Sequence, residues 1–144
     1  MAKTEHEIQV EVFRWAKERE NLFPELRWMF AVPNGSKLPY HRNPSSGKTF
    51  SPQLNYLKAE GLRPGVADLF LPCPNSAYCG LFIELKRGSN QLSPIQQEFL
   101  EDMNAFGYLA VVCRSAEEAE DRILKYLSTD SDIEYSNDLG EDYG

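Results

Sequence analysis

The chain has 144 residues, a formal net charge of −7 and three cysteines. This length fits one domain and is sufficient to bury a hydrophobic core without disulfides or structural metal ions. No apolar run approaches the roughly 20 residues of a membrane span, so we expect no membrane partner. The polar N-terminus predicts no secretory signal peptide, and the odd, scattered set of cysteines favours a reducing compartment over a disulfide framework.

The negative charge is unevenly distributed along the chain. Residues 130–144 contain six acidic residues and no Lys or Arg, which leaves 15 basic and 16 acidic residues in 1–129. We therefore predict one domain over 1–129 and an acidic, disordered tail over 130–144. A net negative charge argues against a nucleic-acid partner, but residues 27–67 contain six basic residues and one acid. This basic segment is able to bind phosphates.

Apolar periodicity, helix caps and turn residues predict the secondary structure. Thr4 and Ser115 are expected to cap helices, and Trp15 and Trp28 are expected in the core. The order of elements predicts a mixed α/β sheet with helices on both faces. In chain order the expected elements are a helix (5–20), a strand (26–32), a long surface loop (33–50), a short helix (52–60), two strands joined by a turn (66–71 and 80–86), a helix (94–106), a strand (108–113) and a helix (115–127).

Charged residues interrupt the two central strands. Side chains alternate between faces along a strand, so Glu84 and Lys86 share one face of an otherwise apolar strand, and Asp68 interrupts the neighbouring strand. Buried charges are costly unless they are paired or bind a metal ion. The turn between the strands is short, so Asp68 and Glu84 can lie side by side, where a divalent cation such as Mg²⁺ or Mn²⁺ would relieve their repulsion. A lysine one pleat away can orient a water or stabilise charge on a phosphate.

Two further polar residues have competing interpretations. Glu5 lies on the same side of the first helix as the apolar stripe, which suits a metal ligand, but an acid in the first turn also compensates the helix dipole. Gln96 can orient a water or a phosphate, but it also stands at the N3 position of a capping box that begins at Ser93. A plain salt-bridge cluster in an unrelated α/β protein remains an alternative for Asp68, Glu84 and Lys86.

Several runs of residues, taken in order, carry a resemblance to a known family. The runs are Thr4–Gln9, Val32–Gly35, Lys58–Gly65, Gly65–Pro72, Gly80–Lys86 and Leu92–Gln96. They resemble the VRR-NUC nuclease domain of the PD-(D/E)XK superfamily, and the resemblance covers roughly residues 4–127. One departure is Ala67, where the family usually has a proline.

The resemblance implies a restriction-endonuclease-like fold with an α-β-β-β-α-β core flanked by helices. It also implies a DNA endonuclease that depends on Mg²⁺ or Mn²⁺ and that is selective for branched DNA such as Holliday junctions or flaps. The competing function is a non-catalytic DNA-binding or assembly protein that retains the fold. The residues implied as catalytic are Asp68, Glu84, Lys86 and Gln96, and those implied as metal ligands are Asp68, Glu84, Leu85 and Glu5.

Single-domain members of this family include homodimers, so a homodimer in the cytoplasm of a bacterium or a phage-infected host is the expectation from resemblance. Positive charge interleaved with Tyr40 and Phe50 in the loop 33–50 can hold phosphates and stack on unpaired bases, although a solvated loop is an equal alternative. The candidate DNA-binding residues are Asn34, Lys37, Arg42, Lys48, Arg63 and Arg87.

Overall fold

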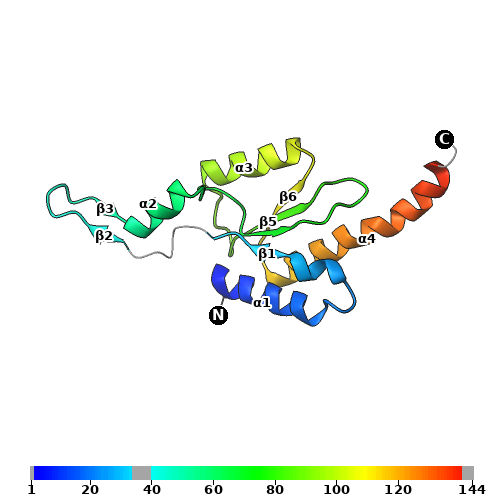
Figure 1. The fold of residues 1–144 in the computed structure, drawn as a ribbon. Coiled ribbons are helices and arrows are strands. Elements are labelled where there is room, and N and C mark those ends of the chain that lie inside the picture. Colours follow the sequence, from blue (N-terminus) through cyan, green and yellow to red (C-terminus); the bar gives the residue numbers. More distant parts are fainter. Residues whose placement is uncertain (1, 34–39, 141–144) are drawn as a thin grey trace.

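The computed structural model describes residues 2–33 and 40–140, with side chains as far as Thr129. Figure 1 shows the chain as a small sheet between helices, with one hairpin and helix projecting to the side. Within the described residues, no helix has the length and apolar character that a membrane crossing requires. The elements are α1 (Glu5–Glu18), the 3-10 helix η1 (Pro24–Trp28), β1 (Phe30–Ala31), β2 (His41–Arg42), β3 (Thr49–Phe50), α2 (Pro52–Ala59), β4 (Leu69–Leu71), β5 (Leu81–Leu85), α3 (Pro94–Ala105), β6 (Leu109–Cys113) and α4 (Ala116–Gly140).

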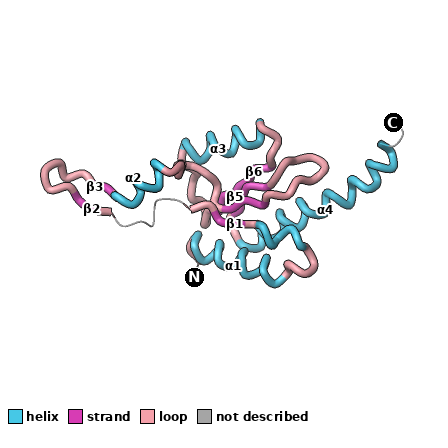
Figure 2. The backbone as a smooth tube through the Cα atoms, viewed as in Figure 1, coloured by secondary structure: helices cyan, strands magenta, loops and turns pink. Residues whose placement is uncertain are grey.

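The main sheet has four strands in the order β1-β4-β5-β6. The pairs β1–β4 and β4–β5 are antiparallel, whereas β5 and β6 are parallel because α3 connects them as a crossover. Helices α1 and α4 cover one face and α3 covers the other, as Figure 2 shows. The predicted mixed α/β fold with helices on both faces is therefore confirmed.

Strand alternation divides the core into two layers. Leu81, Ile83 and Leu85 of β5 are at most 1% exposed and pack on the side of α1 and α4. Phe82, between them, packs toward α3 and meets the ring of Phe99 edge-on at 5.2 Å. This period-two pattern places Glu84 on the α3 side of the sheet, the side that Phe82 occupies.

The predicted helix caps are confirmed. The hydroxyl of Thr4 accepts a hydrogen bond from the Glu7 backbone N–H, and that of Ser115 accepts one from the Glu118 N–H. Each bond satisfies a backbone donor that the helix itself leaves unpaired. The caps explain why α1 and α4 begin where the sequence predicts.

Three elements differ from the sequence-based predictions. The strand expected over 26–32 is reduced to β1, because Pro24 begins a 3-10 turn that buries Leu26 and leaves Trp28 65% exposed. The expected core position of Trp28 is therefore wrong, and the Arg27 guanidinium lies 5.0 Å from the centre of its ring. The described part of the loop 33–50 contains the hairpin of β2 and β3, and α4 continues to Gly140 instead of ending near residue 127.

Residues 40–61 form a projection that we call the arm; it consists of β2, β3 and α2 (Figure 1). No residue of α2 is buried, so the helix is held mainly by local contacts. Ser51 caps it by accepting a hydrogen bond from the Leu54 N–H, and Pro52 occupies the first turn. The arm therefore exposes most of its side chains beside the sheet.

Candidate active site

Asp68 and Glu84 are brought together by the register of β4 and β5. Leu69 pairs with Ile83, so continuing the ladder by one step places Asp68 opposite Glu84. The chain leaves the ladder at this point, and the Oδ2 of Asp68 accepts the backbone N–H of Leu85 at 2.6 Å. A side-chain carboxylate thus replaces a backbone partner and fixes the orientation of Asp68 beside Glu84.

Glu84 is a buried carboxyl, 3% exposed. The pKa of Glu84 is raised from 4.5 to about 9, mainly by burial and also by the hydrogen bond with Asp68 and the negative charge of Asp68, whereas the charge of Lys86 opposes the rise. A cation beside two adjacent carboxyls stabilises their ionised forms and so opposes this rise in the pKa of Glu84. The pair is consequently suited to binding a positive charge.

Lys86 follows the last residue of β5. Its backbone N–H donates to the carbonyl of Cys113 at 3.0 Å, which extends the pairing with β6 and places the half-buried Lys86 on the same face as Glu84. The positive charge of Lys86 lowers the pKa of Glu84 and thus acts against the effect of burial. The predicted i, i+2 arrangement of acid and lysine is present.

Glu5 reaches the site from the first turn of α1. Its Oε2 accepts hydrogen bonds from the Arg87 backbone N–H at 3.2 Å and from Asn90 Nδ2 at 3.4 Å. Its negative charge contributes to the raised pKa of Glu84. Glu5 therefore connects α1 to the loop that follows Lys86. This structural role is additional to the two interpretations, metal ligand and first-turn acid, that the sequence allows.

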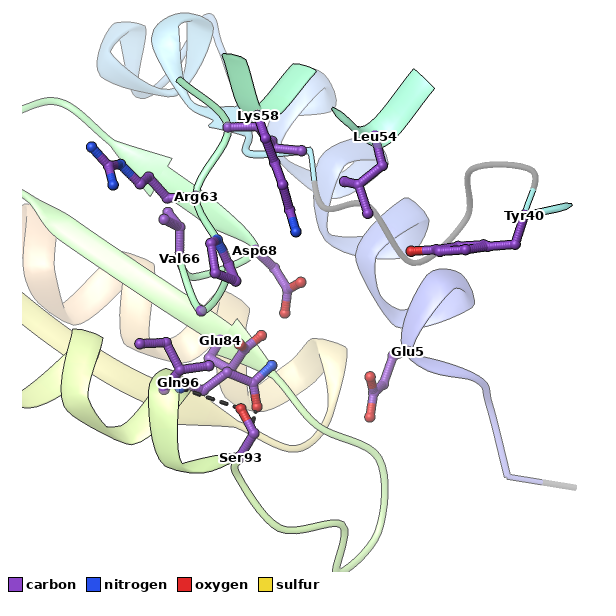
Figure 3. Close-up of a pocket in the computed structure, with 14 residues that line it drawn as sticks. Glu5, Tyr40, Leu54, Lys58, Arg63, Val66, Asp68, Glu84, Ser93 and Gln96 are labelled. Atoms are coloured by element: carbon purple, nitrogen blue, oxygen red, sulfur yellow. Dashed lines mark hydrogen bonds between the residues drawn. The ribbon is translucent and has the colours of Figure 1, made fainter. Parts of the chain in front are cut away.

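Gln96 occupies the capping box that its position predicts. The Ser93 backbone N–H donates to Gln96 Oε1 at 2.9 Å, and the Gln96 N–H donates to the Ser93 hydroxyl at 3.3 Å. In Figure 3 the amide of Gln96 lies beside the carboxyl of Glu84. Gln96 thus caps α3 and also borders the site, so neither interpretation excludes the other.

The side chains of Glu5, Asp68, Glu84 and Gln96 line a cavity of about 420 Å³. Figure 3 shows Asp68 and Glu84 in its wall, Gln96 and Ser93 on one side, Glu5 across from them, and Lys58, Leu54 and Tyr40 from the region of the arm. Lys86 is not among the lining residues, although it shares a strand face with Glu84. The residues lining the cavity are Glu5, Tyr40, Leu54, Lys58, Leu62, Arg63, Pro64, Gly65, Val66, Asp68, Glu84, Ser93, Ile95 and Gln96.

The donor set fits a hard divalent cation. Mg²⁺ is commonly held by one or two carboxylates together with waters, and the adjacent carboxyls of Asp68 and Glu84 supply that number. Among the described residues, no three Asp, Glu, His or Cys side chains are arranged so that together they could hold a metal ion. Glu5 is therefore placed at the edge of the site, and Leu85, whose side chain is buried, can offer a cation only its backbone carbonyl.

The predicted DNA-binding residues occupy different parts of the molecule. Arg63 lines the cavity. Arg87 is exposed, and its backbone N–H donates to Glu5. Arg42 and Lys48 are exposed on the hairpin of the arm and do not line the cavity. Asn34 and Lys37 lie outside the described residues.

Sequence reasoning did not connect two groups of residues with the site. Tyr40, considered only for base stacking in the loop 33–50, and Lys58 line the cavity although they precede Asp68 by 28 and 10 residues. Their place within the basic segment 27–67 was the available signal. Asn90 and Arg114 support the loop after β5, where Arg114 Nη1 donates to the carbonyls of Gly88 and Asn90 at 2.9 Å each. No local pattern marks these long-range contacts.

Comparison with known proteins identifies the family. The model of the VRR-NUC domain matches residues 3–117. A solved structure described as a VRR_NUC domain protein is similar with a TM-score of 0.67 and 26% sequence identity, over 90% of this chain and 92% of that chain. A search of curated proteins finds no match. Since the family model covers most of its length, the chain belongs to the VRR-NUC domain family, which indicates a nuclease-type, DNA-processing fold.

Proposed function

We propose that the chain is a Mg²⁺- or Mn²⁺-dependent endonuclease that hydrolyses phosphodiester bonds in structured, branched DNA such as Holliday junctions or flaps. The observation that carries the proposal is the juxtaposition of the buried Glu84 in β5 with the half-buried Asp68 just before β4, with Lys86 on the same face and a cavity beside them. Family membership implies DNA binding, which supports DNA as the substrate.

Each residue of the site has a proposed role. Asp68 and Glu84 would hold the cation, with the Leu85 carbonyl and Glu5 at the edge of its shell. When bound, the cation supplies Lewis acidity toward the phosphate and the attacking water. The ammonium of Lys86 stabilises negative charge on the phosphoryl oxygens and orients the water, and the Gln96 amide donates a hydrogen bond to a phosphate oxygen.

The positive charge needed for DNA is provided locally. Lys58 and Arg63 line the cavity, and Arg42 and Lys48 extend positive charge along the arm. Phosphate contacts of this kind provide affinity and orientation without reading sequence. We further propose that two copies associate so that two sites face two strands of a branched substrate, which light scattering of the purified protein tests directly.

The test of catalysis compares wild type with Lys86→Ala and with Lys125→Ala. Lys125 is an exposed lysine of α4 that pairs with Asp121 at 2.9 Å and serves as the matched control. Branched, flapped and linear DNA are incubated with Mg²⁺, Mn²⁺ or EDTA. Wild type and Lys125→Ala are expected to cleave branched DNA in Mg²⁺ or Mn²⁺ only, and Lys86→Ala is expected to be slower by about 10²–10⁴-fold.

Two outcomes contradict the proposal. If wild type cleaves no DNA with either ion, or if Lys86→Ala cleaves as fast as wild type, the proposed mechanism is wrong. Calorimetric titration with Mn²⁺ then separates the remaining functions, because a folded protein that binds DNA but no divalent cation is a non-catalytic binding module.

A further inference from the structure

We propose that the apolar residues lining the cavity bind the base of an unpaired nucleotide adjacent to the phosphate held at Asp68 and Glu84. This inference rests on the proposed nuclease function and specifies its substrate. It follows from the mixed acidic and apolar lining of the cavity, from the exposure of the apolar residues and from the position of the basic side chain of Lys58 beside them.

The cavity is lined by both acids and apolar side chains. Glu5, Asp68 and Glu84 supply the acids, and the rest of the lining includes aliphatic side chains and one aromatic ring. Tyr40 is 48% exposed and Ile95 is 44% exposed, so large apolar groups face solvent next to the carboxyls. The apolar residues are Tyr40, Leu54, Leu62, Pro64, Val66 and Ile95.

Part of this apolar surface is held rigidly. Gly65 has a φ of +86°, and a Cβ at this position would lie 2.7 Å from Ile95 Cγ1. Only glycine allows this backbone conformation together with so close an approach. The backbone at Gly65 is therefore packed against Ile95, a residue 30 positions later in the sequence, before any ligand arrives, as expected of a preformed binding pocket.

A phosphate alone does not account for an apolar surface. Phosphates are recognised by cations and by hydrogen-bond donors. A base within a duplex is stacked on its neighbours and presents only its edges in the grooves, whereas an unpaired base exposes two faces that stack on aromatic and apolar side chains. A cavity of about 420 Å³ also lies within the size range of small-molecule pockets. An unpaired base is the part of a DNA substrate that matches this surface.

The position of the basic side chain of Lys58 would place the phosphate next to the base. Lys58 is exposed on α2 one turn after Leu54, so both residues project from the same face of the helix. Figure 3 shows Lys58 extending into the cavity on the side of Asp68. A nucleotide whose base contacts Leu54 and Tyr40 would therefore bring its phosphate between Lys58 and the two carboxyls.

The experiment measures binding with Lys86→Ala in Mg²⁺, so that the DNA stays intact. Three duplexes share one sequence: one is fully paired, one carries a single unpaired 2-aminopurine, and one carries an abasic residue at that bulged position. The abasic bulge keeps the bend of the DNA but lacks the base. We expect the bulged base to be bound about tenfold more tightly than either other duplex, with a change in 2-aminopurine emission on binding.

Variants locate the base. Leu54→Ala and Tyr40→Ala are expected to reduce the preference for the bulged base severalfold, and Tyr40→Phe to retain it. Leu22→Ala and Tyr56→Ala remove exposed apolar side chains outside the cavity, 77% and 68% exposed, and serve as matched controls that leave the preference unchanged. Thermal unfolding of every variant verifies that it is folded.

The outcomes distinguish this inference from the proposed function. Equal affinity for the three duplexes, or an unchanged 2-aminopurine emission, overturns the base-binding inference even if wild type cleaves DNA. Absence of metal-dependent cleavage by wild type contradicts the nuclease function. Even then, tighter binding of the bulged base that is lost in Leu54→Ala would support the cavity as a base-binding pocket.

Discussion

The carboxylate of Asp68 accepts a hydrogen bond of 2.6 Å from the backbone N–H of Leu85. In the register of β4 and β5 this N–H faces Ala67, so the side chain of Asp68 occupies the place of a backbone acceptor. The bond joins the two strands at the point where the site begins. Asp68 therefore has a structural role in addition to its proposed role toward a cation, and the two roles can be separated by mutation.

Asp68→Asn and Asp68→Ala are expected to differ in stability but not in metal binding. Asn retains an oxygen that accepts the Leu85 N–H and removes the charge beside Glu84, whereas Ala leaves a buried donor unpaired at a cost of about 1–3 kcal/mol. Chemical denaturation in EDTA should therefore rank Asp68→Ala well below Asp68→Asn. Both variants should lose the increase in stability that Mn²⁺ gives wild type.

An equal stability of the two Asp68 variants would show that the Leu85 contact contributes little. Retention of the Mn²⁺ effect by Asp68→Asn would contradict the proposed cation site.

Glu84→Gln is expected to stabilise the protein without metal at neutral pH. The folded-state pKa of Glu84 is raised from 4.5 to about 9, so the folded state binds more protons than the unfolded state between these values. The stability contribution is fully present below pH 4.5 and is lost as the pH rises through about 9. Gln keeps a neutral, hydrogen-bonding group of similar shape and removes this loss.

Melting temperatures in EDTA between pH 5 and pH 9 measure the effect. Wild type should lose stability with rising pH more steeply than Glu84→Gln, and the variant should melt a few degrees higher at pH 8. Glu98→Gln, on the exposed surface of α3, provides the control for removing one acidic charge. Parallel curves for wild type and Glu84→Gln would show that Glu84 is ionised throughout this range.

The pairing of Asp68 with Glu84 was predictable because it depends on local rules. Period-two alternation places Asp68 and Glu84 on one face, although residues 72–80 connect β4 and β5 by a longer loop than the short turn expected from the sequence. A serine followed by Pro94 predicts the start of α3. The exposure of Trp28 was not predictable from its apolar character, since the turn at Pro24 decides which residue of that segment faces the core.

Contacts between distant segments lay beyond the sequence pattern. Lys58 and Tyr40 enter the cavity because α2 and the chain before β2 are placed next to it, and no periodicity encodes that placement. The contact of Asn90 with Glu5 spans 85 residues. Local patterns therefore predicted the centre of the site, whereas tertiary packing determines its borders.

Lys58→Ala and Arg63→Ala are expected to weaken DNA binding by a similar factor for every DNA substrate tested. Both residues line the cavity and carry exposed charges. If each contacts one phosphate, each substitution lowers the magnitude of the slope of log Kobs against log salt concentration by about 1. Titrations at several salt concentrations measure the slope, with Lys125→Ala as control. An unchanged slope for both variants would place the DNA phosphates elsewhere.

Asn90→Asp is expected to weaken cation binding through Glu5. Asn90 Nδ2 donates to Glu5 Oε2 at 3.4 Å, and Arg114 holds the backbone of the same loop through the Gly88 and Asn90 carbonyls. A carboxylate in place of the amide repels Glu5 and removes a donor that positions it. Groups that orient a ligand at the edge of a metal site typically change affinity by 10–100-fold, so we expect about a tenfold loss of Mn²⁺ affinity.

Gln91→Glu is the matched control for this substitution. Gln91 lies in the same loop and its amide donates to the Ser89 carbonyl at 3.2 Å rather than to Glu5, so the variant adds the same charge nearby without repelling Glu5 directly. Calorimetric titration with Mn²⁺ compares the two variants, and melting temperatures show whether either has lost its fold. Equal Mn²⁺ affinities for Asn90→Asp and Gln91→Glu would mean that Glu5 acts only as a first-turn acid of α1, whereas a selective loss in Asn90→Asp assigns Glu5 to the cation site.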